Sequence, residues 1–359
     1  MGTVTTTIYT KQATALTTAH YANNGNAIFD AIEASGMLRV PHEVAPGQCD
    51  RLVTAATENP FDAVVTLQYP TWGSAANRHT KGFKIFRHPD LGFYLKISVL
   101  EMGGQSASTT SLGLSVQYAS ELTAEGALEN PLTFYPRAGS AFGWAPGSTS
   151  YYAGKELTLR VSTGRDHFVF GHTFDMGSYE HSSAISSGEN WSGNCMNPRG
   201  GYSTLAFAVV QTSDPKYNVI MAPRTLESNS SYAQEPNTSS FSPLDSGLPR
   251  KWLVDTTTGA TTYLGGGQSV TGMPEPGTVS DKYGVRVAQL TMTVNGEQLS
   301  LPLGTVHGGA VGDMGLLTFD LDGNGPRQFF CSYGFGPTTF VSCRHLIANT
   351  PYMLFPYGD

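Results

Sequence analysis

The stretch Phe93-Tyr94-Leu95-Lys96-Ile97-Ser98-Val99 alternates core-type and more polar side chains at every position. Successive side chains of a β-strand point to opposite faces, so a period of two indicates a strand with one buried face. The apolar segment Phe83–Arg87 precedes it, and His88–Gly92 between the two contains a proline and a glycine. These residues predict an antiparallel hairpin.

Four further pairs of β-prone segments flank short turn sequences and predict four more hairpins. The pairs are 157–162 with 168–171, 205–211 with 217–221, 284–294 with 298–306, and 315–321 with 328–333. The third pair encloses Asn295-Gly296. This dipeptide favours a type I′ turn, because both of its residues tolerate a positive φ.

One segment predicts a helix. Ala27–Ala34 places Ile28 and Ile32 on one face, with Asn26 in front of it as the capping residue. Gly36 follows at the position of the glycine that ends many helices. The expected fold class is therefore mainly β: antiparallel β-sandwich or barrel-like domains with a short N-terminal helix.

The chain of 359 residues is longer than a single hydrophobic core usually grows, which predicts more than one domain. The segment 225–249 is polar, contains many Ser and Pro residues and has almost no aliphatic side chains, so we expect a linker or a long loop there. The expected organisation is an N-terminal arm and helix (1–40), a β-rich domain (41–224), this linker (225–249) and a C-terminal β domain with an extended tail (250–359).

Only 14% of the residues are charged, whereas an ordinary soluble domain has about 25%. The Lys and Arg residues are scattered and the net charge is −7, which argues against nucleic acid as a partner. No apolar run approaches the roughly 20 residues of a membrane helix, so membrane insertion is not expected. The Thr-rich N-terminus has neither a basic nor an apolar segment, so we expect no signal peptide and synthesis in a cytoplasm.

Asp320, Asp322 and Asn324, followed by Gly325, match the first oxygen ligands and the glycine of a calcium loop. The later positions depart from the pattern, because Cys331 stands where a calcium loop has its glutamate. The same Asp-Gly-Asn-Gly segment between two strands is more simply a hairpin turn. These residues are a weak calcium candidate, and no cofactor is expected.

No motif of a hydrolase, metalloprotease or nucleotide-binding enzyme occurs in the chain, so no catalytic residue is assigned and a non-enzymatic protein is expected. His167, His172, His181 and Cys195 are the residues to consider for zinc. The spacing of the first two places them on opposite faces of one strand, so we interpret them as ordinary polar strand residues. A carboxylate pair for glycan hydrolysis stays open, because the fold and not the spacing brings such a pair together.

Aromatic residues in uncharged loops are the candidates for a binding site or an interface. Trp144, Tyr151 and Tyr152 lie in the uncharged loop 138–154, and Trp191 lies in a segment of Ser, Gly and Asn. Such side chains stack on sugars or fill protein interfaces, and they also cover the edges of β-cores. Both interpretations stay open for these four residues.

The segment Ile347–Asp359 contains many large apolar residues, among which Tyr352 and Phe355 are interface candidates. Pro351 and Pro356 disfavour a helix and limit sheet pairing. We therefore expect an ordered extended arm that is docked on its own body or on a neighbouring subunit.

The four cysteines are too few and too scattered for a disulfide framework. Residues 329–333 and 339–343 flank a turn at Pro337, and Cys331 and Cys343 are equally far from this proline, which predicts a hairpin with Cys331 opposite Cys343. We expect both to be free thiols, as is usual in a cytoplasm.

In its composition and in the kinds of segment along it, the chain resembles the virion structural proteins of tailed bacteriophages, particularly tail-tip and baseplate components. The resemblance rests on the Thr-rich start (Thr3–Thr7), the early capped helix (Asn26–Ala34), hairpins such as Phe83–Glu101 and the Gly/Pro/aromatic ending (Thr350–Asp359). It extends over the whole chain and involves no diagnostic motif. It implies a symmetric oligomer in a virion, with copies of the chain and other virion or tail proteins as partners and with no cofactor.

The leading hypothesis is a structural subunit of a bacteriophage tail or baseplate. The alternative is a receptor-binding or carbohydrate-binding adsorption protein of the same particle, with a host surface glycan as partner. A glycan-active hydrolase is the third hypothesis. The expected location is the virion.

Overall fold

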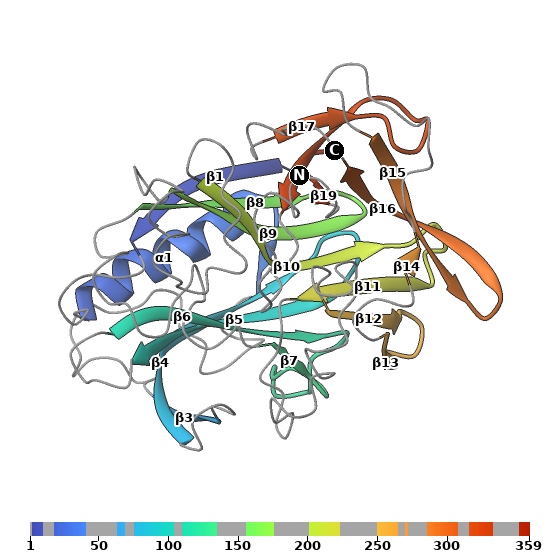
Figure 1. The fold of residues 1–359 in the computed structure, drawn as a ribbon. Helices are drawn as coiled ribbons and strands as arrows, with labels where there is room; N and C mark the ends of the chain where they lie inside the picture. Colours follow the sequence, from blue (N-terminus) through green and yellow to red (C-terminus); the bar gives the residue numbers. More distant parts are fainter. Residues whose placement is uncertain are drawn as a thin grey trace. The chain divides into compact units, whose positions relative to one another are not determined.

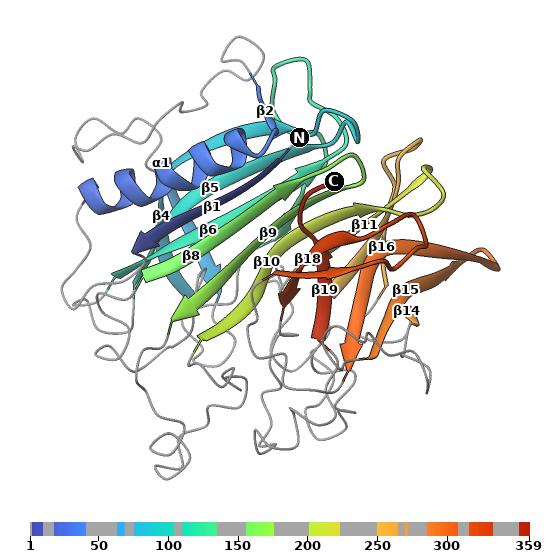
Figure 2. The ribbon, with the colours of Figure 1, turned by 90° about the horizontal axis from the view of Figure 1, so that it is seen from above.

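The structure is a computed structural model that describes residues 2–9, 18–40, 63–68, 75–103, 110–134, 156–175, 201–222, 250–264, 270–271, 286–307, 316–332 and 352–359. These ranges contain the helix α1 (Thr18–Ala34) and the strands β1 (Gly2–Tyr9), β2 (Leu38–Arg39), β3 (Ala63–Gln68), β4 (Ala75–Arg87), β5 (Tyr94–Gly103), β6 (Thr110–Ala119), β7 (Leu132–Phe134), β8 (Glu156–Thr163), β9 (His167–Asp175), β10 (Gly201–Gln211), β11 (Tyr217–Ala222), β12 (Arg250–Asp255), β13 (Thr261–Tyr263), β14 (Val270–Thr271), β15 (Arg286–Val294), β16 (Glu297–His307), β17 (Leu316–Phe319), β18 (Arg327–Ser332) and β19 (Tyr352–Pro356). Strands dominate, and their pairings are antiparallel, which confirms the expected mainly β class (Figures 1 and 2).

The chain divides into two compact units, which differ from the expected domains. Unit 1 comprises Met1–Thr3, Ser162–Ala222 and Pro236–Asp359, and unit 2 comprises Val4–Val161 and Pro223–Glu235. The observed units differ from the expected domains because β11 pairs with β12, with Val219 opposite Leu253. The polar segment 225–249 therefore falls between two neighbouring strands of one sheet, whereas we expected it to separate two domains.

Unit 2 contains a sheet with the strand order β2-β4-β5-β6-β7, and β3 pairs with β4 as well. The expected hairpin forms from β4 and β5, where Phe86 lies opposite Leu95. The alternating side chains Phe93, Leu95, Ile97 and Val99 are all at most 2% exposed, which confirms the period-two pattern.

Helix α1 packs against this sheet through side chains that are almost completely buried. The rings of Phe29 and Phe86 lie 6.4 Å apart. Lys84 on β4 is buried and forms an ion pair with Glu33 at 3.4 Å, which compensates part of the cost of burying its charge.

The helix begins at Thr18, well before the expected cap at Asn26. Asn26 is only 9% exposed and lies inside the helix, so its side chain does not cap the N-terminus. A capping residue type permits a helix to begin but does not prevent one from continuing through it. The C-terminal end is as expected, because Gly36 has a φ of 113° and follows the last turn directly.

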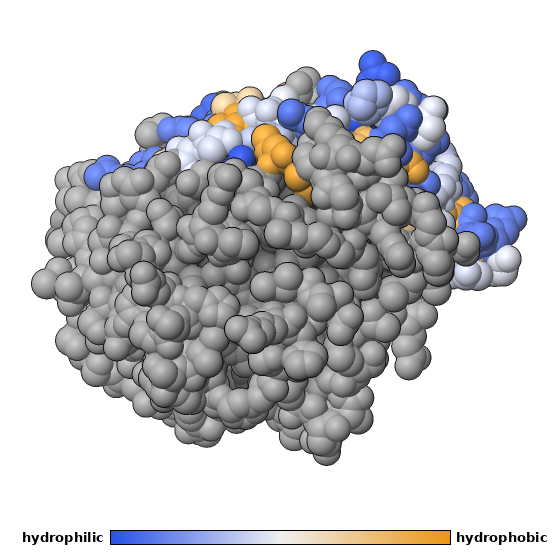
Figure 3. All heavy atoms as spheres, turned by 45° about the horizontal axis from the view of Figure 1, so that its top comes forward, coloured by the Kyte–Doolittle hydropathy of each residue, from blue (hydrophilic) through white to orange (hydrophobic). Residues whose placement is uncertain are grey.

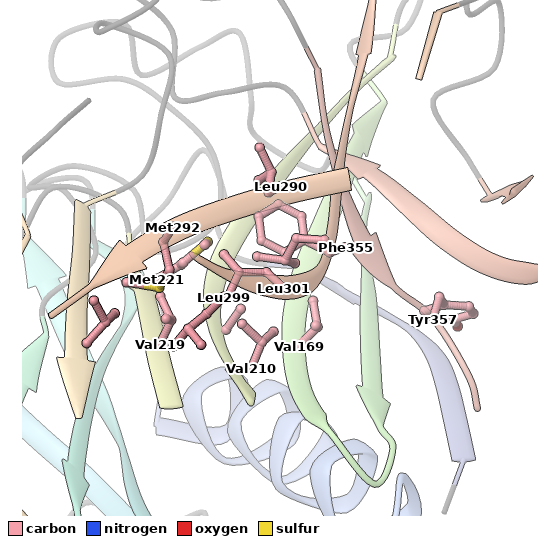
Figure 4. Close-up of a cluster of buried hydrophobic side chains, with 13 residues drawn as sticks. Val169, Val210, Val219, Met221, Leu290, Met292, Leu299, Leu301, Phe355 and Tyr357 are labelled. Atoms are coloured by element: carbon pink, nitrogen blue, oxygen red, sulfur yellow. The ribbon is translucent and has the colours of Figure 1, made fainter. Parts of the chain in front are cut away.

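Unit 1 holds β9 to β13 of a seven-stranded sheet with the order β1-β8-β9-β10-β11-β12-β13. It also holds a six-stranded sheet with the order β14-β15-β16-β19-β18-β17. Apolar side chains of the two sheets meet in one core, as in a β-sandwich (Figure 4). The buried members are Val169, Ala208, Val210, Val219, Met221, Leu290, Met292, Val294, Leu299, Leu301, Leu303, Phe355 and Tyr357.

The turns of unit 1 follow the local sequence. Asn295 and Gly296 have φ angles of 51° and 88°, which are the two positive values of a type I′ turn between β15 and β16. The hairpins of β10 with β11 and of β17 with β18 also form as the sequence predicted.

The C-terminal arm forms β19, which lies inside the sheet between β16 and β18. Leu354 and Phe355 are at most 1% exposed, so the arm docks on its own body. Phe355 is therefore a core residue of its own chain, and of the two docking surfaces expected for the arm it uses the chain's own body. Pro356 is the last residue of the strand, where its missing N–H costs little.

The expected hairpin of 329–333 with 339–343 is excluded at Phe330, whereas the pairing of Cys331 with Cys343 stays a prediction. Phe330 on β18 already has Leu316 of β17 on one side and Phe355 of β19 on the other. Both edges of β18 are occupied there, so the second arm of the hairpin cannot pair at that position. Cys343 lies outside the described residues.

On the face drawn in Figure 3, most of the described residues are hydrophilic, and hydrophobic ones form separate small spots. Among the residues whose burial is described, Leu38 and Tyr263 are the large hydrophobic residues with about half of their surface exposed, at 50% and 51%. Among the described segments, no helix has the length and apolar character needed to cross a membrane.

Candidate functional site: a buried polar network

The β8–β9 hairpin brings together a serine, an aspartate and a histidine. Ser162 lies near the end of β8, Asp166 lies in the turn, and His167 begins β9. The turn closes with a hydrogen bond of 3.0 Å from the Gly164 N–H to the His167 carbonyl. Ser162 and His167 are completely buried, whereas 34% of the Asp166 side chain is exposed.

Two short hydrogen bonds join these three side chains. Ser162 Oγ lies 2.8 Å from His167 Nε2, and His167 Nδ1 lies 2.8 Å from Asp166 Oδ1. We assign the proton of the neutral imidazole to Nδ1, because it then donates to the carboxylate while Nε2 accepts from the serine hydroxyl.

The planar guanidinium group of Arg327, at the start of β18, binds the same carboxylate. Its two terminal nitrogens donate to the two oxygens of Asp166 at 2.9 and 2.8 Å, which is a bidentate ion pair. Its Nε donates to the Gly358 carbonyl at 3.1 Å.

Gly358 closes the arrangement from the C-terminal side. Its N–H donates to Ser162 Oγ at 2.9 Å, so both backbone polar groups of Gly358 are bound. Its φ of 95° favours glycine, since other residues are strained there. We call Ser162, Asp166, His167, Arg327 and Gly358 the polar network.

The network has a defined charge pattern. Burial alone would raise the pKa of Asp166, but the hydrogen bonds and charges of Arg327 and His167 hold that pKa well below its usual range. Burial lowers the pKa of His167, and the hydrogen bond to Asp166 opposes this effect only in part. The resting state is therefore an ionised Asp166 beside a neutral His167.

Gly164 is essential to the packing of this site. A Cβ atom at this position would overlap the imidazole of His167 and would approach Asp359 Oδ1 to 2.9 Å. The ring thus lies directly over the glycine, and any side chain at position 164 would displace it.

Ser162, His167 and Asp166 are connected in the same order as the groups of a serine hydrolase triad. In such an enzyme the hydroxyl must be accessible to substrate. Here Ser162 is completely buried, and its oxygen accepts the N–H of Gly358. This geometry is suited to fixing the C-terminal residues to the β8–β9 hairpin.

The weak calcium candidate forms the turn between β17 and β18. Asp320 Oδ1 accepts the Gly323 N–H at 2.8 Å, and Asp322 Oδ1 accepts the Asn324 N–H at 3.0 Å. Hydrogen bonds from Asn324 lower the pKa of Asp322. The carboxylates of Asp320 and Asp322 thus stabilise their own turn, as expected for a hairpin turn. In the part of the chain that the structure describes, no group of three or more His, Cys, Asp or Glu residues is arranged to hold a metal ion.

Several predicted candidates lie outside the described residues. These are Trp144, Tyr151, Tyr152, Trp191, His181 and Cys195. His172 pairs with Thr204 on β10, and Tyr352 pairs with Val306 on β16. The side chains of His172 and Tyr352 are outside the description.

The sequence reasoning considered His167 but missed its partners. It predicted a turn at Gly164, and this turn places Asp166 beside His167. Arg327 is 160 positions away from His167, and no spacing pattern connects them. No protein-family model, curated protein or solved structure matches this chain.

Proposed function

We propose that this protein is a non-enzymatic structural subunit of a bacteriophage tail or baseplate assembly. In this proposal it functions in the virion, with copies of itself and other virion proteins as partners. The whole-chain resemblance to tail-tip and baseplate proteins is the basis for the proposal, and the low charge of 14% is consistent with a surface covered by other subunits.

The closed polar network is the observation that supports a structural role most directly. The reactive residue types Ser162 and His167 are buried, and their hydrogen bonds hold Gly358. A hydrolase would need the same groups open to substrate. The network instead holds Gly358 against the β8–β9 hairpin and β18.

The assembly state provides the test. Sedimentation of the purified full chain at tens of micromolar should give an oligomer of defined size, and electron microscopy should show a symmetric particle. Mass spectrometry of purified virions should detect the chain. A protein that stays monomeric at these concentrations and is absent from particles would contradict the proposal.

One observation favours the adsorption alternative. Tyr263 on β13 is 51% exposed, and its ring lies 5.3 Å from that of Trp252. An exposed aromatic ring held by a second ring is a suitable platform for sugar stacking. Binding to a host glycan that Tyr263→Ala abolishes, with the fold unchanged, would favour this alternative. The hydrolase hypothesis stays a prediction.

A further inference from the structure

The polar network contains one histidine, His167, and histidine is the type of side chain that takes up a proton in mildly acidic solution. His167 is faced by the charged groups of Asp166, Arg327 and Asp359 and by the neutral hydroxyl of Ser162. On the neighbouring β10 it lies opposite Val210, which is apolar.

A second proton on His167 conflicts with the hydrogen bonds around it. In the neutral ring Nε2 accepts from Ser162, whose oxygen in turn accepts from Gly358. Protonated Nε2 becomes a donor, so the serine hydroxyl loses its acceptor and its oxygen must accept twice. A buried donor without a partner destabilises the arrangement that includes Gly358.

The charges add to this conflict. A terminal nitrogen of Arg327 lies 2.9 Å from His167 Nδ1, so an imidazolium would place two positive groups in contact. Asp166 lies between them, but it already forms the bidentate ion pair with Arg327. Asp359 favours the protonated ring, but it is exposed, and water screens its charge.

We propose that the polar network is an acid-sensitive lock on Gly358 and Asp359: protonation of His167 releases these two residues, while Tyr357 stays in the core and β19 stays in its sheet. Strand β19 stays because Leu354 and Phe355 are buried, because Leu354 is paired on both sides and because Phe355 is paired with Phe330 on β18. Tyr357 stays because its side chain is buried in the core and its N–H donates to the Gln328 carbonyl, so beyond it the chain is held by the two hydrogen bonds of Gly358. This proposal does not depend on the assembly in which the protein functions.

Residue-resolved hydrogen exchange of the full chain tests the lock. The protection factor of the Gly358 amide should fall at least about tenfold between neutral pH and about pH 5, a change equivalent to one pKa unit. Protection at Leu354 and Phe355 should not change. In His167→Gln, which does not titrate in this range, the loss of protection should be absent.

A second variant keeps the proposal testable if His167→Gln does not fold. Asp359→Asn removes the charge that favours the imidazolium in the locked state, so the loss of protection on acidification should be at least as large as in the unmodified chain. Constant protection of Gly358 down to about pH 4, where ordinary carboxylates begin to protonate, would overturn the proposal. So would an equal loss in His167→Gln, or a smaller loss in Asp359→Asn than in the unmodified chain.

Discussion

Arg327 binds both oxygens of Asp166 and the carbonyl of Gly358 through three different nitrogens. We expect Arg327→Ala to lower the free energy of unfolding by about 2–3 kcal/mol, because it leaves a partly buried carboxylate and a carbonyl without these partners. Arg327→Lys should recover only part of this loss, since a lysine supplies the charge without the planar fork. Urea denaturation would measure both changes.

The matched control is Arg165, which lies in the same turn region but is exposed. Arg165→Ala should change the free energy of unfolding by less than about 0.5 kcal/mol. Equal effects of Arg165→Ala and Arg327→Ala would show that general charge, and not the network, determines stability here.

Among the elements, the β15–β16 hairpin depends most on local backbone conformation. Gly296 has a φ of 88°, and a Cβ atom there would meet no other atom within 4 Å. Gly296→Ala should therefore destabilise the protein by about 1–2 kcal/mol through backbone strain alone. Asn295→Gly keeps a residue that accepts the positive φ and is the control, with a much smaller expected change in thermal unfolding.

Strand β19 depends on burial. Leu354 is completely buried and lies opposite Gly304 on β16 and Cys331 on β18. Leu354→Ala should lower the free energy of unfolding by about 2–4 kcal/mol through lost apolar contacts and a cavity. Gln328→Ala on the neighbouring β18 is exposed and should have little effect. A small loss for Leu354→Ala would contradict the interior position of β19.

The sequence predicted the hairpins well, because alternation and turn chemistry act over a few residues. Asn295-Gly296 determines its own turn, and the alternation around Leu95 determines which face is buried. The position of β19 was not predictable in this way. Its two neighbours, β16 and β18, are not consecutive strands of the chain. Only the completed core determines that β19 lies between them.

At the scale of the whole molecule, the free energy of unfolding should depend on pH in two steps. Burial lowers the pKa of His167, and the partners of Asp166 lower the pKa of that carboxyl. A lowered pKa in the folded state means that the unfolded state binds protons first as the pH falls. Stability should thus be constant above about pH 7, decrease below about pH 6.5 through His167, and decrease again below about pH 4 through Asp166.

Urea titrations at a series of pH values measure this dependence. In His167→Gln the first decrease should disappear, while the second remains. A protein that becomes more stable as the pH falls from neutral to about 5, the range of histidine titration, would contradict both assigned protonation states.

The fold class was predictable from the sequence, whereas the two units and the polar network were not. The composition of 225–249 predicted a linker or a long loop. The strands before and after this segment, β11 and β12, pair with each other in one sheet. The network joins a hairpin near His167 to residues 160 and more positions away. Long-range contacts of this kind carry no local periodicity, so a single sequence gives no signal for them.

The order β14-β15-β16-β19-β18-β17 also constrains how the protein is made. Until residue 356 has left the ribosome, β14–β16 and β17–β18 are two separate pieces, and β16 and β18 each have an open edge. Translation at roughly 5–20 residues per second keeps the edge of β16 open for several seconds. Nascent chains with open, apolar strand edges associate with one another. Chaperone binding during synthesis, or a slow codon stretch before residue 352, would therefore change the yield of folded protein more than the final stability does.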